Sequence, residues 1–435
     1  MGVLMIEQQF DVVVVGASLA GCTAAMLYAR DGLSVALVER DDDPNAYKQM
    51  CTHFIQGSAT PTLRRLGLTT PIEAVGGVRN AVNMWTQWGW IIEPDLRDNS
   101  GERLFGYSLR REVLDPMLRA LATATPGVQT FFGYAARELV RKNGRVAGVN
   151  VHHDATTLSL CARLVVAADG RNSRLAKLAQ VPTTSSPNIR GGITALYRNV
   201  QLKCGQVSQM WFKGTHVAYV FPNDDNITLV TVMPPRHELA EIGENPRAWL
   251  EAYIRALPDG LDLSSAEPLG NCFQLKDYPN LSRPVIASGM ALIGDAAVSM
   301  DPLYGVGCGW AFQTAEWLVD STVDALKRRT DLDAPLRNYA KVHAKKLAGH
   351  QFVIKDFSKR NRFNLIERVM FRAATLDQGA AKHVYRFGMR LSSLREFLAP
   401  GAIFRALWLN LFGGADSSRP RTHRTPPPMG TRRLD

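Results

Sequence analysis

The 435-residue chain lacks the features that mark secreted, metal-binding and membrane-spanning proteins. Its six cysteines lie far apart, with no CxxC pair and no cluster with histidine, so we expect reduced thiols and no metal site. No window reaches about 18 uncharged apolar residues, the length that a spanning helix needs. The first residues, MGVLMIEQQFDVVVVG, lack a basic leader and carry Glu7 and Asp11, which argues against a signal peptide. These absences predict a cytoplasmic protein.

The composition is that of an ordinary globular protein, but the charge is unevenly distributed. With 46% hydrophobic and 21% charged residues, the chain is not disordered, collagenous or a coiled coil. Residues 326–435 carry 23 basic and 8 acidic side chains, whereas the rest carries 28 and 32. A basic segment suits a membrane surface or an acidic carrier protein, and no recognisable nucleic-acid module accompanies it, so we expect no nucleic-acid partner. The alternative is a solvated helical face with a basic tail.

Hydrophobic patterns predict an α/β fold. The run DVVVV (11–15) is typical of a strand buried on both faces, and a helix over 19–30 and a strand over 34–40 follow it. Two more buried strands are expected at 164–170 and 291–297, each ending in a turn with an aspartate. Short alternating runs over 190–275 indicate an antiparallel sheet, and residues 335–412 read as helical.

These patterns divide the chain into four parts. Residues 1–185 with 276–330 would form a discontinuous nucleotide-binding domain, and residues 186–275 an antiparallel-sheet substrate domain inserted in it. Residues 331–414 would form a basic helical region. Residues 415–435, rich in Pro, Ser and Arg, are predicted to be a disordered tail.

The first candidate site is the glycine-rich turn Gly16-x-Ser18-x-x-Gly21, between the first strand and its helix. Such glycines let the backbone approach a pyrophosphate, and the helix start adds free N–H groups. Glu39 ends the next strand, 18 residues past Gly21, where an acid can accept a hydrogen bond from a ribose hydroxyl. The pattern predicts a dinucleotide site, with a plain glycine-rich turn as the alternative.

Two further turns follow buried strands: AADGRNSR at 167–174 and GDAAVSMDPLYGVG at 294–307. Each alone could be a strand-end turn or a helix cap. Together with the first turn, their order and spacing indicate one composite site.

With these stretches and Arg111-x-x-Leu114-Asp115, the sequence resembles the FAD-dependent monooxygenases of the para-hydroxybenzoate hydroxylase type. The wider group includes flavin halogenases, epoxidases and geranylgeranyl reductases. The resemblance implies a glutathione-reductase-like FAD-binding Rossmann fold with an interleaved substrate domain and a helical C-terminal region. It also implies a set of cofactor-binding positions, namely Gly16, Ser18, Leu19, Ala20, Gly21, Glu39, Arg40, Arg111, Asp169, Gly170, Asp295, Pro302, Gly305, Val306 and Gly307.

The chemistry that the resemblance implies is oxygen transfer. NADPH or NADH, directly or through a reductase, would reduce FAD, and oxygen would then form a flavin C4a-hydroperoxide that hydroxylates or epoxidises an apolar aromatic or polyene molecule. Such a site must exclude water. Aromatic side chains are candidate pocket walls, and ordinary core positions are the alternative for each: Trp85, Trp88, Trp90, Trp211, Phe212, Tyr219 and Phe221. His53 is the candidate catalytic base, with a structural histidine as the alternative.

Three other functions stay open. Halogenation is disfavoured, because the lysine that halogenases carry near the flavin has no counterpart between Lys48 and Lys142. Reduction of prenyl double bonds is favoured by Asp301-Pro302, by the AYVFP stretch (218–222) and by the basic C-terminal region, which could lie on a membrane. The remaining option is a flavin-binding protein with no turnover, or a cyclase-like enzyme that uses reduced FAD without net redox.

Overall fold

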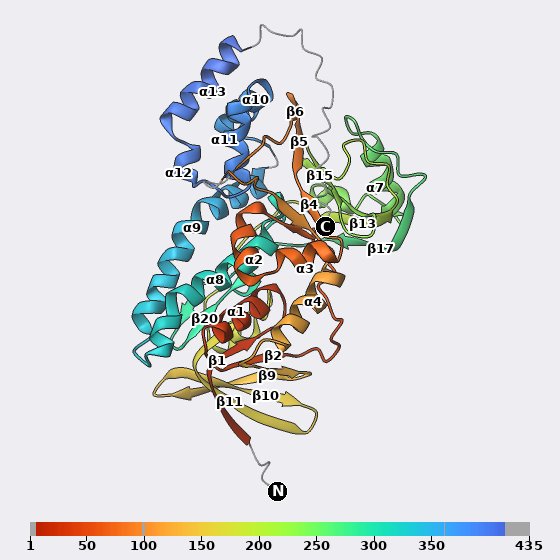
Figure 1. The fold of residues 1–435 in the computed structure, drawn as a ribbon. Coiled ribbons are helices and arrows are strands. Elements are labelled where there is room, and N and C mark those ends of the chain that lie inside the picture. The colour runs from red at the N-terminus through yellow and green to blue at the C-terminus, as the bar shows by residue number, and fades with distance from the viewer. Residues whose placement is uncertain (1–5, 98–100, 361, 414–435) are drawn as a thin grey trace, which may run out of the picture.

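Figure 1 shows the computed structural model of the chain, which describes residues 6–97, 101–360 and 362–413. The first sheet lies toward the N-terminal end, the second sheet lies beyond it, and the last helices occupy the opposite end. The α/β class, the inserted antiparallel sheet and the helical C-terminal region predicted from the sequence are confirmed. The exact division into four parts stays a prediction, and the predicted tail lies outside the described residues.

The first sheet is built around β1 (Ile6–Val15), which pairs in parallel with β2 (Val35–Glu39) and β11 (Thr156–Ala167). On one side β2 pairs with β8 (Val128–Phe132), and on the other β11 pairs with β20 (Met290–Leu292), both in parallel. The core of this part of the molecule includes residues 12–15, which are buried because helices cover the sheet. The covering helices include α1 (Leu19–Arg30), α4 (Arg111–Thr123) and α8 (Val306–Lys327).

An antiparallel hairpin of β9 (Ala135–Lys142) and β10 (Arg145–His153) extends this sheet from β11. Its turn is Asn143-Gly144, and both residues have positive φ, 52° and 76°. Asn and Gly accept this backbone conformation more readily than other residues, which is why the pair is typical of two-residue hairpin turns.

The second sheet has the strand order β17-β13-β16-β15-β14-β5-β6. Its strands within the predicted range are β13 (Gly192–Arg198), β14 (Ser208–Lys213), β15 (His216–Pro222), β16 (Ile227–Met233) and β17 (Glu267–Leu275). The predicted range 186–275 omits two members, β5 (Val82–Thr86) and β6 (Gly89–Ile91). They were missed because β5 pairs in parallel with β14, a strand more than a hundred residues away, and the local pattern carries no sign of that pairing.

The two faces of the second sheet pack on different partners. Met210, Phe212, Tyr219 and Phe221 point into a core shared with the C-terminal helices. Alternate residues, such as Trp211, point into a separate core that includes α7 (Pro246–Arg255). This split follows from the two-residue period of a strand, which sends successive side chains to opposite faces.

The remaining elements are short, and one of them, β19 (Ile286–Ala287), is an edge strand of the first sheet that pairs antiparallel with β20. The strands are β3 (Phe54–Ile55), β4 (Val78–Asn80), β7 (Gly106–Ser108), β12 (Thr184–Ser186), β18 (Asn280–Ser282), β19 (Ile286–Ala287) and β21 (Val298–Ser299). The helical elements are η1 (Gly57–Ala59), α2 (Thr60–Leu66), α3 (Thr69–Ala74), α5 (Arg174–Leu178), α6 (Arg236–Leu239), η2 (Gly294–Ala296) and η3 (Leu303–Gly305).

The C-terminal region is helical, as predicted. Its helices are α9 (Asp333–Arg360), α10 (Leu365–Leu376), α11 (Gln378–Gly388), α12 (Leu394–Phe397) and α13 (Pro400–Phe412). Capping boxes begin α10, at Asn364 and Glu367, and α12, at Ser393 and Glu396. Each box satisfies backbone N–H groups that a helix start leaves free. Within the ranges that the structure covers, we find no helix long and apolar enough to span a bilayer.

Candidate functional site

The three glycine-and-acid turns meet at one edge of the first sheet. They follow β1, β11 and β20, which are parallel neighbours in the order β20-β11-β1, so their carboxyl ends lie side by side. Open α/β sheets bind ligands at this edge. A cavity of about 800 Å³ lies there, at the upper end of the usual range for ligand pockets.

The first turn leaves no room for side chains at two positions. Gly16 has φ +106°, and a Cβ there would lie 2.4 Å from the Ala168 carbonyl oxygen. A Cβ on Gly21 would lie 1.7 Å from the Gly16 carbonyl oxygen, so α1 can begin this close to β1 only with glycine. Ser18 caps α1 without a side-chain bond to the helix, so the N–H groups of its first turn are left for a ligand.

Glu39, at the end of β2, is fixed beside this turn. Its Oε2 accepts a hydrogen bond from the Ala17 N–H at 2.8 Å, and its carboxylate lines the cavity. Arg40 also lines the cavity. This placement fits the predicted role of Glu39 as acceptor for a ribose hydroxyl.

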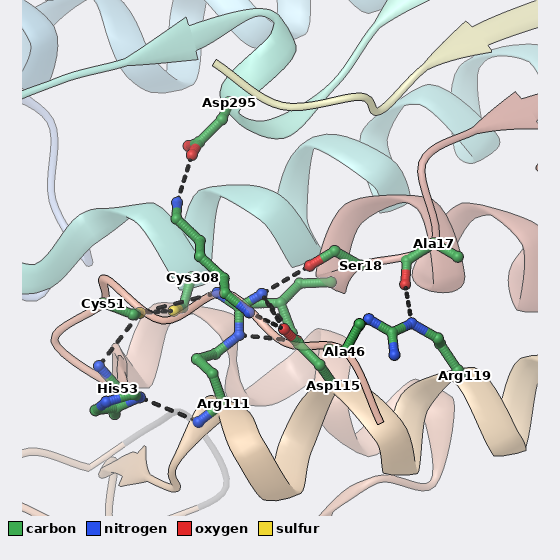
Figure 2. Close-up of polar contacts among 12 residues, drawn as sticks. Ala17, Ser18, Ala46, Cys51, His53, Arg111, Asp115, Arg119, Asp295 and Cys308 are labelled. Carbon is green, nitrogen blue, oxygen red and sulfur yellow. Dashed lines mark hydrogen bonds and ion pairs between the residues drawn. The ribbon is translucent and has the colours of Figure 1, made fainter. Parts of the chain in front are cut away.

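A buried arginine joins the first turn to α4, as Figure 2 shows. Arg111 donates from Nη2 to Ser18 Oγ at 2.7 Å, and its guanidinium forms an ion pair with Asp115 at 2.8 Å. The side chains of Arg111 and Asp115 are 4% and 1% exposed, so the pair lies out of water. Arg119, one turn further along α4, donates to the Ala17 carbonyl at 3.0 Å. These contacts hold the glycine-rich turn against α4.

The second turn presents an orphaned carboxylate oxygen. Asp169 Oδ2 accepts from the Leu175 N–H at 3.0 Å, but Oδ1 is buried and has no hydrogen-bond partner among the described residues. Burial raises the pKa of Asp169 above its usual range. Buried acceptors are rarely left unpaired, so this oxygen suits a hydroxyl or amide donor of a bound cofactor.

The third turn carries Asp295 and a strained loop. Asp295 Oδ2 accepts from Lys48 Nζ at 2.7 Å, across the cavity that both side chains line, and this carboxylate raises the pKa of Lys48. In the following loop Tyr304 and Gly305 have positive φ, 64° and 62°. A bulky residue such as Tyr304 adopts this conformation at an energetic cost, a form of strain that clusters at functional sites.

Two cysteines meet at the wall of the cavity. Cys51 Sγ and Cys308 Sγ lie 3.5 Å apart, although the residues are 257 positions apart in the chain. The hydrogen bond from Cys308 lowers the pKa of Cys51, and Arg111, His53 and Lys48 add to the effect. The same bond raises the pKa of Cys308. The pair therefore places two thiols whose pKa values shift in opposite directions in the wall of the cavity.

The structure brings together all but one of the predicted cofactor residues. Gly16, Ser18, Leu19, Ala20, Glu39, Arg40, Arg111, Asp169, Gly170, Asp295, Pro302, Gly305, Val306 and Gly307 line the cavity. Gly21 does not line it, since it lies behind the turn, where it allows the close approach of α1. That these residues hold FAD stays a prediction.

The predicted pocket aromatics do not line this cavity. Trp85 and Trp211 are register partners on the face of the second sheet that packs toward α7. Trp88 stacks on Phe363, and Tyr219 and Phe221 pack with Phe54 beneath the C-terminal helices. Strand periodicity thus divides the aromatic residues between two cores, which is why they do not form one wall.

His53 does not fit the predicted role of a base. Its Nδ1 accepts from the Arg111 N–H at 3.0 Å, it is buried, and it does not line the cavity. Burial lowers its pKa. We therefore assign it to the structural alternative. Nor do we see, in the described part of the chain, any group of three His, Cys, Asp or Glu side chains able to hold a metal ion.

A protein-family model described as an FAD binding domain matches residues 9–331, about three quarters of the chain. The chain belongs to this FAD-binding family. The resemblance to para-hydroxybenzoate hydroxylase-type flavoproteins is thereby confirmed, and with it an FAD-dependent oxidoreductase.

Known relatives of this flavoprotein carry different names. It is 25% identical over 363 residues to digeranylgeranylglycerophospholipid reductase 1 of Methanococcoides burtonii, covering 77% of this chain and 79% of that protein. It is 26% identical over 325 residues to protein FixC of Escherichia coli K12, covering 67% and 71%. Among solved structures, the flavin-dependent brominase Bmp2 superposes with a TM-score of 0.74 at 18% identity, covering 92% of this chain and 98% of Bmp2. That likeness concerns the fold alone.

The residues of this flavoprotein fit FAD by their own geometry. Two glycines leave space where a Cβ would clash, a helix start faces the cavity, and the Asp169 oxygen lacks a partner. Sequence reasoning missed Lys48, Cys51 and Cys308, whose partners are far away in the chain. The Arg111–Asp115 ion pair could have been predicted from the sequence, because residues at positions i and i+4 of a helix are neighbours.

Proposed function

We propose that this flavoprotein reduces carbon–carbon double bonds of an apolar, unsaturated chain-like molecule. The observation that carries the proposal is the thiol pair Cys51–Cys308 in the wall of the cavity. A thiolate is the form of cysteine that oxidants attack most readily. An oxidant formed in this cavity would meet the Cys51 thiol in its wall, whereas a reductive reaction leaves the thiol pair intact.

The side of the cavity formed by the second sheet supports an apolar substrate. The residues that β13, β16 and β17 contribute, with the position just before β13, carry no ionisable side chain: Gly191, Gly192, Thr194, Thr231, Met233, Phe273 and Leu275. With His53 turned away, this wall offers no base to activate a phenol. An alkene, which needs no such activation, fits the wall better.

The name of one relative points in the same direction. The Methanococcoides burtonii relative is called a reductase of a digeranylgeranyl lipid, and it aligns over most of both chains. Bound FAD would supply the hydride for such a reduction, with NADPH or NADH as the predicted electron donor. The protein's own part is to bind and orient the substrate, to exclude water and to supply a proton, and the Cys308 thiol in the cavity wall is the donor that we propose.

The test is a single-turnover reaction, carried out once without oxygen and once in air. The purified flavoprotein is reduced with dithionite without oxygen and mixed with geranylgeraniol as a probe. Reoxidation of the flavin together with a product that has gained two hydrogens would support the proposal. Flavin that stays reduced with the probe, across a panel of prenyl and polyene compounds, would contradict it.

Monooxygenation, that is hydroxylation or epoxidation, is the second candidate, and the apolar wall favours it because oxygen transfer needs a dry site. It predicts a product that gains one oxygen atom, and only in air. We do not propose halogenation, since Lys48, the lysine that the described cavity contains, is bound to Asp295.

A further inference from the structure

The outer face of α13 is apolar. Five of its side chains are exposed, at the spacing i, i+3, i+4, i+7 and i+8 that places residues on one side of a helix. They are Phe404, Leu407, Trp408, Leu411 and Phe412, with exposed fractions of 70%, 44%, 56%, 74% and 60%. We call them the α13 stripe. Large exposed apolar patches mark interaction sites in proteins that are otherwise well packed.

The opposite side of α13 is already in use, so the stripe faces outward. Ala406 is buried, and Leu409 packs against the core beneath the C-terminal helices. Asn410 donates to the Val369 carbonyl at 2.9 Å, and Arg405 pairs with Asp377 at 2.9 Å. These contacts fix the rotation of the helix. In Figure 1 α13 lies at the end of the molecule opposite to the N-terminus.

The surroundings of the stripe are basic. Residues 351–413 contain 11 lysines and arginines against 4 aspartates and glutamates. Of the four acids, Glu396 alone is exposed in the described chain, whereas Arg362, Arg368 and Arg395 are among the exposed cations. An apolar stripe in a basic setting complements an anionic bilayer, which offers an apolar interior beneath negative headgroups. Two copies of this region would instead repel each other.

A mostly apolar cavity lies between the C-terminal helices and the loop at residues 302–307, which belongs to the predicted cofactor site. It has a volume of about 160 Å³, and its wall includes Phe352 and Ile366, which are 64% and 41% exposed, so the cavity reaches the surface. Its inner wall includes Tyr304. The neighbours of Tyr304, at positions 302 and 305, line the large cavity. The helical end thus carries an apolar recess that extends from the surface to the loop of the cofactor site.

We propose that the α13 stripe docks the protein on the surface of an anionic phospholipid bilayer, without spanning it. Leu365, which is 75% exposed at the start of α10, and Phe352 would add apolar contacts close to the recess. The inference does not depend on which reaction the flavin performs.

The test is flotation of the full-length, flavin-loaded protein with vesicles. One set is phosphatidylcholine alone, and the other is phosphatidylcholine and phosphatidylglycerol in equal parts. We expect binding to the mixed vesicles that weakens with salt, and about tenfold weaker binding for Phe404→Glu/Leu411→Glu. The control Ile6→Glu/Val75→Glu makes the same charge change at exposed apolar positions outside the helical end and should bind as the unmodified protein does. Flavin absorbance confirms that each variant is folded.

Trp408 provides a second readout. Its emission, obtained as the difference between the unmodified protein and Trp408→Phe, should shift to the blue on mixed vesicles as the indole leaves water. Three results would overturn the proposal. The first is no flotation with either kind of vesicle. The second is flotation that Phe404→Glu/Leu411→Glu leaves unchanged, which would assign binding to the basic tail. The third is dimerisation through the α13 stripe without vesicle binding.

Discussion

The cofactor end and the α13 end of this flavoprotein place their polar and apolar groups in opposite ways. At the cofactor end, charged side chains such as Arg111 and Asp115 are buried and paired beneath a ligand cavity. At the α13 end, large apolar side chains face outward, and the exposed basic side chains outnumber the one exposed acid that the structure describes in residues 351–413, Glu396. Both arrangements cost stability in a protein without a partner, which is consistent with a dinucleotide at one end and with the lipid surface that we propose at the other.

The largest effect should come from breaking the buried ion pair. Asp115→Asn leaves the Arg111 guanidinium without its counter-charge, which costs about 3–5 kcal/mol of unfolding free energy. Asp320→Asn removes a partner of Arg65 from a pair that is partly exposed and should cost less than about 1 kcal/mol. Urea unfolding measures both. If the two variants lost the same unfolding free energy, the burial of the Arg111–Asp115 pair would not make it more important to stability than an exposed pair.

A methyl group at the first turn should have the next largest effect. Gly21→Ala places a Cβ against the Gly16 carbonyl and should cost about 2–3 kcal/mol and lower the flavin content. Gly401→Ala adds the same methyl group in open space near the start of α13, so it should leave the flavin content unchanged and should stabilise the fold by at most about 1 kcal/mol. Thermal unfolding and flavin absorbance are the measurements. A fully loaded Gly21→Ala protein would contradict the role of this turn.

A fall in pH should destabilise the protein through two buried histidines of α9. Burial lowers the pKa of His343 and His350, both on α9, to about 4. Between about pH 4 and 6.5 the unfolded chain binds more protons than the folded one, so stability falls as the pH falls through this window, by about 1–2 kcal/mol per histidine at pH 5. His350→Gln should flatten this dependence and His237→Gln, at an exposed position, should not. An unchanged slope in His350→Gln would contradict the assignment.

The predicted cofactor acids can be tested by flavin affinity. Asp169→Ala and Asp295→Ala should each weaken FAD binding at least tenfold, about 1.4 kcal/mol, because each removes an acceptor that lines the cavity. Asp262→Ala, at a surface turn that does not line the cavity, is the control. Fluorescence titration of apoprotein with FAD measures the change. If both variants stay fully loaded, the site assignment is wrong.

The smallest effect is expected at the contact that orients α13. Arg405→Ala removes an exposed ion pair with Asp377 and should cost less than about 1 kcal/mol. The free energy of unfolding in urea should barely change, and vesicle flotation should be reduced less than by Phe404→Glu/Leu411→Glu. A loss as large as theirs would mean that charge, not the stripe, dominates docking.

Much of the cofactor site followed from local patterns. The turn at Gly16, the acid at Glu39 and the strand-end aspartates Asp169 and Asp295 are each defined by a strand and the few residues after it. Parallel neighbouring strands then bring these local features to one edge. The pocket aromatics could not be predicted in the same way, since the face on which Trp211 or Tyr219 lies depends on register within the second sheet.

The sequence by itself determined the α/β class, the three glycine-and-acid turns of the predicted flavin site and the helical nature of the basic C-terminal region, because strand and helix periods and glycine turns act over a few residues. Only the tertiary structure decided the contacts between distant segments: β5 beside β14, Lys48 on Asp295, and Cys51 against Cys308. It also decided which side of α13 faces solvent, since that side is set by what the rest of the helix packs against.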